Sequence, residues 1–87
     1  MANRKRLKKS INIVMGELFA DCVALSMLGE GDQQKLHDLM AEVLNVHSDF
    51  VARLSHVEKH SAHAFCQKLR ADFTAKVNDL SERIVQA

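Results

Sequence analysis

The chain contains no proline and only three glycines among its 87 residues, and this shortage of turn-forming residues most constrains how it can fold. An all-β domain needs frequent turns, and those turns depend largely on Gly, Pro, Asn and Asp. Two of the three glycines fall in one segment, Gly29-Glu30-Gly31-Asp32. A Gly beyond the end of one helix and an Asp at the start of the next are typical of a connection between helices. The sequence therefore predicts an all-α fold with a helix–helix connection here.

Apolar residues recur every three or four positions in three long segments, as expected for helices that each bury one face. The segments cover about 4–28, 33–56 and 62–85, with a weaker break at 56–61 where Ser61 is a candidate cap. The predicted buried faces are Leu7, Ile11, Val14, Leu18, Cys22 and Leu25; Leu36, Met40, Val43, His47, Phe50 and Leu54; and Phe65, Cys66, Leu69, Phe73, Val77, Leu80 and Ile84.

Short connections make consecutive helices antiparallel neighbours. We therefore predict one helical domain, residues 1–87, folded as an up-down-up three-helix bundle. If the weak break at 56–61 is absent, the alternative is a long helical hairpin that must dimerise.

The first predicted helix is apolar on more than one side, because a second apolar set lies beside its buried face and toward its back. A helix that is apolar nearly all round is buried on more than one side, and a domain of this size has a thin core. We therefore predict a homodimer with this helix at its centre. The predicted interface residues are Ile13, Met15, Phe19, Val23 and Met27.

The net charge of +1 conceals a basic arm, residues 1–9, which continues into the first helix. The arm holds five of the 12 Lys and Arg residues, which leaves seven basic against 11 acidic residues in 10–87. Such an arm can hold the phosphates of nucleic acid or of an anionic membrane. One hypothesis is therefore nucleic-acid contact, and the alternative is a solvated helix start. The residues concerned are Arg4, Lys5, Arg6, Lys8 and Lys9.

His47 lies within the apolar stripe of the second predicted helix, so its imidazole needs a hydrogen-bond partner. Asp21 flanks the apolar stripe of the first helix, and Glu17 lies one turn before it. We predict a buried polar network in which Asp21 and Glu17 meet His47 or Arg53 across helices or subunits, and in which the network specifies helix register. The alternative is a core histidine bonded to a backbone carbonyl or to water.

A histidine cluster, His56, His60 and His63, has a spacing that suits one face of a helix, as a metal site requires. The cluster straddles the predicted break, so we expect exposed histidines and predict no metal or other cofactor. Cys22 and Cys66 fall on apolar stripes and are expected to be buried free thiols. The chain lacks a glycine-rich phosphate loop and a nucleophile elbow, which favours a protein that is not an enzyme.

The apolar run Ile11 to Leu28 follows a basic start, as in a secretory signal or a membrane span. Glu17 and Asp21 interrupt it, and a charge at the centre of a bilayer costs about 2.5–3.5 kcal/mol. We therefore expect a cytoplasmic protein without a membrane span. The predicted function is a non-enzymatic helical interaction module that dimerises and binds a macromolecular partner. The alternatives are a nucleic-acid-associated regulator and a metal-binding protein.

Overall fold

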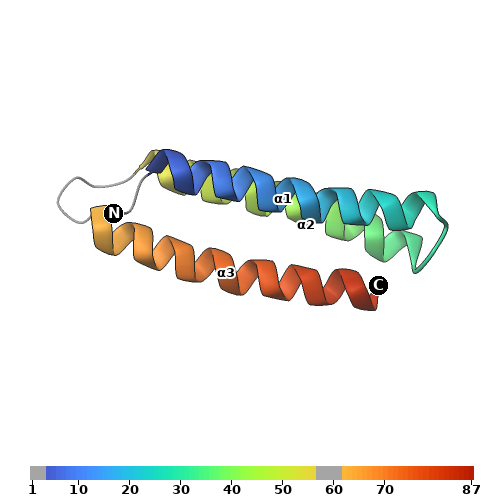
Figure 1. Cartoon of the computed structure of the whole chain (residues 1–87). Helices are drawn as coiled ribbons and strands as arrows, with labels where there is room; N and C mark the ends of the chain where they lie inside the picture. Colours follow the sequence, from blue (N-terminus) through green and yellow to red (C-terminus); the bar gives the residue numbers. More distant parts are fainter. Residues whose placement is uncertain (1–3, 57–61) are drawn as a thin grey trace.

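The computed structural model describes residues 4–56 and 62–87, with the side chains of residues 5–56 and 63–87. It contains three α-helices: α1 (Arg4–Met27), α2 (Gln33–Ser55) and α3 (Ala62–Gln86). Consecutive helices run in opposite directions along one long axis (Figure 1). The predicted all-α, up-down-up three-helix bundle is confirmed. The hairpin alternative is wrong, because α2 ends at Ser55 and α3 is a separate helix that begins at Ala62. The candidate cap Ser61 lies outside the described residues.

The connection between α1 and α2 is built as the sequence predicts. Gly29 has a φ of 71°, and its amide donates to the carbonyl of Ser26 while the Glu30 amide donates to that of Leu25. This pair of bonds satisfies the last carbonyls of α1 and requires a left-handed residue, which favours glycine. The carboxylate of Asp32 then accepts the amides of Gln34 and Lys35, at 3.0 and 3.2 Å, and so caps α2.

The core is a single column of apolar side chains that runs between the three helices. Its most deeply buried members, each less than 2% exposed, are Ile11, Met15, Cys22, Val43, Leu69 and Leu80. Leu36 is equally buried but is not part of this cluster. Met15 is therefore a core residue, and its assignment to a dimer interface is wrong for this fold. It lies one turn after Ile11 and one turn before Leu18, so it shares the face that those two buried residues define.

The bundle is a rod with a large surface for its mass. It measures 48 × 18 × 17 Å, and its radius of gyration of 14.4 Å exceeds the roughly 12 Å of a compact domain of this length. Its accessible surface is 5986 Å², against about 5,200 Å² for a typical monomer of 9.8 kDa. A thin core and an extended surface follow directly from three long helices laid side by side.

The carboxyl end of α3 packs on the connection between α1 and α2. A Cβ placed on Gly31 would lie only 2.6 Å from the carbonyl oxygen of Ala87. Gly31 also has a φ of 75°, so both its left-handed backbone conformation and the close approach of Ala87 favour glycine at this position. This contact closes one end of the rod.

Within the described residues, one helix, Lys5–Met27, is long and apolar enough to cross a membrane by length and composition alone. Core helices of soluble proteins meet the same criterion, so the observation assigns no location. Within the most apolar window of this helix, 22% of the residues are buried inside the chain.

Candidate functional site

The side of α1 and α2 that is turned away from α3 forms a long uncharged surface, which we call the outward face. Helical periodicity assigns to it Asn12, Ile13, Gly16, Phe19, Ala20, Val23 and Met27 of α1, and His37, Met40, Leu44, Ser48 and Val51 of α2. Phe19, Val23, Met40 and Val51 are partly buried. Three of the large apolar side chains are well exposed: Ile13 by 52%, Leu44 by 53% and Met27 by 82%. Gly16 and Ala20 lie between them, and because their side chains are absent or short, little protrudes from the helix at the centre of the face.

Charged residues in the same stretches of α1 and α2 point elsewhere. Asp21 lines a hollow with Ile84 and Val85 of α3, and Glu17 lies one turn before Asp21. On α2, Glu42 pairs with Arg83 of α3, and the exposed Asp38 accepts a hydrogen bond from Gln34 on its own helix. The outward face is therefore uncharged because the acidic side chains of both helices are rotated toward α3 and solvent. Of the five residues predicted to form a dimer interface, it contains Ile13, Phe19, Val23 and Met27.

The four residues of the predicted buried polar network do not come together in the single chain. His47 is half-buried, and its Nε2 lies 2.6 Å from Oδ1 of Asn12 in α1. Arg53 instead bonds Asp72 of α3 at 2.9 Å, and Glu17 and Asp21 are exposed. Among the described residues no polar or charged side chain is buried. A network across subunits stays a prediction.

The guanidinium of Arg53 has a second contact, since its carbon lies 5.0 Å from the ring centre of Phe50. The Phe50 ring in turn meets that of Phe73 edge-on, with centroids 5.3 Å apart. A cation over an aromatic face gains electrostatic attraction, and an edge-on ring pair is a favoured geometry. Together with the Asp72 bond, these contacts fasten α2 to α3 near the middle of α3.

A second polar cluster between α2 and α3 was not predicted. Glu42 is only partly exposed and accepts two hydrogen bonds from Arg83, at 2.6 and 2.9 Å. Lys76 lies 3.3 Å from the same carboxylate, and Asp79 lies 3.3 Å from Arg83. Lys76 and Arg83 are two helical turns apart, so they share one side of α3. Two basic residues seven positions apart on one helix, and an acidic residue beside the apolar stripe of the neighbouring helix, form the sequence pattern that could have predicted the cluster.

The cluster also sets the ionisation of its members. The hydrogen bonds from Arg83, and then those from Lys76, hold the pKa of Glu42 below its usual range, against the opposing effect of partial burial. The same bonds raise the pKa of Arg83, so the pair is ionised at neutral pH. Every group in it is already paired, which makes the cluster a clamp between helices rather than a reactive site.

Charge is distributed from end to end of the rod rather than between an arm and a body. We cut each helix at its midpoint and call the two parts the basic half and the acidic half. The basic half, residues 4–15, 44–56 and 62–74, holds eight Lys and Arg against two Asp and Glu. The acidic half, residues 16–43 and 75–87, holds eight Asp and Glu against three Lys and Arg. Arg53, Lys68 and Arg70 therefore join the predicted basic arm at one end.

The histidine cluster is not assembled in the part of the chain that the structure describes. His56 and His63 are both exposed, and His60 lies outside the described residues. No group of three His, Cys, Asp or Glu residues among those described is close enough together to hold a metal ion. Cys22 and Cys66 are buried free thiols, as predicted. Burial, with a smaller contribution from Asp21, raises the pKa of Cys22.

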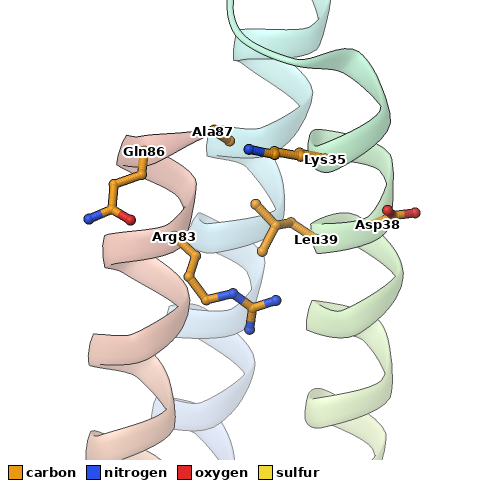
Figure 2. A pocket seen from close by; sticks show the side chains of 6 residues that line it. All are labelled: Lys35, Asp38, Leu39, Arg83, Gln86 and Ala87. Carbon is orange, nitrogen blue, oxygen red and sulfur yellow. The ribbon is translucent and has the colours of Figure 1, made fainter.

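A hollow between α2 and α3 has a volume of about 310 Å³. Lys35 and Arg83 reach to either side of Leu39, whereas Asp38 and Gln86 point away from it (Figure 2). Small-molecule sites have convergent polar groups in an enclosed apolar pocket. Here the guanidinium is engaged by Glu42 and Asp79, so the hollow offers little for a ligand to bind.

Comparison of the chain with protein-family models, with curated proteins and with solved structures found no match.

Proposed function

We propose that the chain is a non-enzymatic helical interaction module, which forms a homodimer through the outward face and leaves its other surfaces to a macromolecular partner. The observation that carries the proposal is the outward face, where exposed apolar side chains and no charges follow α1 for about four turns. Contiguous apolar surface of this kind marks a protein or membrane contact.

The size of the face fits a second copy. A standard interface buries about 800 Å² on each partner, or roughly 13% of the 5986 Å² that this chain exposes. One long side of a rod 48 Å in length supplies that area. A two-fold dimer uses the same face on both copies, so a single surface suffices.

A second copy also fits the charges of α1 better than lipid does. Insertion of α1 into a bilayer would take Glu17 and Asp21 with it, at about 2.5–3.5 kcal/mol for a charge near the centre. A protein that covers only the outward face leaves both carboxylates in water. The proposal therefore includes a cytoplasmic protein without a membrane span.

The test places one charge at the centre of the face. Ala20→Glu puts a carboxylate between two apposed helices, and Ala75→Glu makes the same change on the exposed side of α3 as a control. In sedimentation equilibrium we expect twice the chain mass for the wild type and for Ala75→Glu, and the chain mass for Ala20→Glu. A monomeric wild type, or an Ala20→Glu variant that dimerises as well as the control, refutes the proposal.

A second candidate function, contact with nucleic acid, is favoured by the excess of six positive charges in the basic half. A cluster of this kind binds phosphates with an affinity that falls steeply with salt. We expect a fluorescent DNA or RNA duplex to bind at 50 mM salt, to dissociate by about 200 mM, and to bind less well to Lys8→Glu/Lys9→Glu. The control Lys35→Glu, in the acidic half, should bind like the wild type. An absence of binding at low salt excludes this function.

A further inference from the structure

We propose that two copies associate with α1 antiparallel to its counterpart, so that the basic half of each copy lies beside the acidic half of the other. This inference rests on the proposed dimer and adds its orientation. It is carried by a separate observation, the end-to-end separation of charge along the rod.

A face used twice allows two kinds of two-fold dimer. If the axis runs along the helices, the copies are parallel, and two halves with six excess positive charges each lie side by side. If the axis is perpendicular to the helices, the copies are antiparallel, and each basic half meets a half with five excess negative charges. Complementary charge around an apolar contact steers association and rejects the wrong arrangement, so the antiparallel dimer is favoured.

The small residues of α1 indicate where the two helices cross. Gly16 and Ala20 lie one turn apart at the centre of the outward face and permit the closest approach of two backbones. An antiparallel crossing between them places Lys9 near Met27 of the second copy. The first turns of α1 then lie along the α1–α2 connection of that copy, where Glu30 and Asp32 are both exposed.

In this register, apolar surface meets apolar surface and basic residues meet acidic residues. The outward face of α1, from Ile13 to Met27, carries no charge and meets its own counterpart, and the basic first turns extend past it to an acidic connection. Any parallel register sets the basic first turns of the two copies against each other. The apolar contact provides the association, and the charges at its two ends select its direction.

The orientation is tested with a nitroxide spin label on Met27→Cys. Met27 is 82% exposed and the two natural thiols are buried, so the reagent reaches the introduced cysteine. In the antiparallel dimer the two labels lie about 27 Å apart along the helices, because each is nine residues from the crossing. In a parallel dimer they lie about 10 Å apart. A short distance overturns the orientation and leaves the dimer standing, whereas a monomer in sedimentation overturns both.

The role of charge is tested by reversal and repair. We expect Glu30→Lys to raise the dimer dissociation constant about 3- to 10-fold, as the loss and reversal of exposed ion pairs at both ends requires. Lys9→Glu in the same chain should restore most of the affinity. An unchanged constant for Glu30→Lys, or a double variant weaker than either single variant, overturns the proposed charge selection.

Discussion

The close approach of Gly31 to Ala87 predicts that two glycines in one connection respond differently to the same substitution. Gly29 and Gly31 have nearly equal φ values, 71° and 75°, so an alanine at either position carries the same left-handed strain. That strain costs about 1–2 kcal/mol and is partly offset by about 0.4–1 kcal/mol from the less flexible unfolded chain. Gly29→Ala should therefore lower the free energy of unfolding by about 1 kcal/mol.

Gly31→Ala has a further cost that Gly29→Ala lacks. No atom lies within 4 Å of a Cβ on Gly29, whereas a Cβ on Gly31 meets the Ala87 carbonyl oxygen at 2.6 Å. An ordinary contact of these atoms is about 3.3 Å or more, so the last turn of α3 must move away. The amide of Ala87, which donates to the Ile84 carbonyl at 3.3 Å, is then released. Loss of one such bond and its packing adds about 1 kcal/mol.

Urea denaturation of the two variants measures this difference directly. We expect Gly31→Ala to be about 1 kcal/mol less stable than Gly29→Ala, which corresponds to about 4–8 °C in Tm for a domain of this size. Removal of Ala87 should abolish the difference, because the clashing oxygen is then absent. Equal stability of the two variants in the intact chain would refute the reasoning, as would a difference that survives removal of Ala87.

Three further predictions concern the other local contacts. Glu42→Gln should lower Tm by about 2–4 °C relative to the exposed control Glu82→Gln. Arg83 lowers the pKa of Glu42 in the folded state. The stabilisation by the Glu42 carboxylate is therefore complete above the unfolded-state pKa of about 4.3 and is lost as the pH falls through the folded-state pKa. A difference in Tm between the two variants that is as large at pH 2 as at pH 7 would contradict this. Asp32→Ala should destabilise α2 by about 1 kcal/mol in thermal unfolding monitored by circular dichroism, and an unchanged Tm would show that the cap is dispensable. The Cys22 thiol, buried and with a raised pKa, should react with a disulfide reagent at neutral pH only after denaturation, so rapid labelling of the native protein would contradict its burial.

The features that the sequence predicts well are local. The connection at Gly29 and Asp32 follows from the conformational needs of a helix end and a helix start, which involve only neighbouring residues. The period of the apolar stripes likewise follows from the geometry of one helix. The number and limits of the helices could therefore be predicted within about two residues, a usual uncertainty for helix ends.

The features that the sequence does not determine depend on how the helices are rotated against one another. Met15 and Val14 are both apolar neighbours of Ile11, and only the positions of α2 and α3 decide that Met15 is fully buried and Val14 is not. The same rotation brings Glu42 to Arg83, 41 residues away, and leaves Asp21 in solvent. The basic arm could be predicted from the sequence. That Arg53 lies at the same end of the rod as the arm follows only from the way the helices pack.

The unequal packing between the three pairs of helices affects the order in which they fold. α1 packs more extensively against α2 than either helix packs against α3. Contacts between neighbouring helices close short loops, so we expect the α1–α2 pair to form first and α3 to add last, as pulsed hydrogen exchange would detect from late protection of α3 amides. The outward face belongs entirely to the first two helices. A growing chain would thus complete the face through which we propose that it dimerises before its last helix is in place, so the proposed dimerisation and the final folding step would overlap in time.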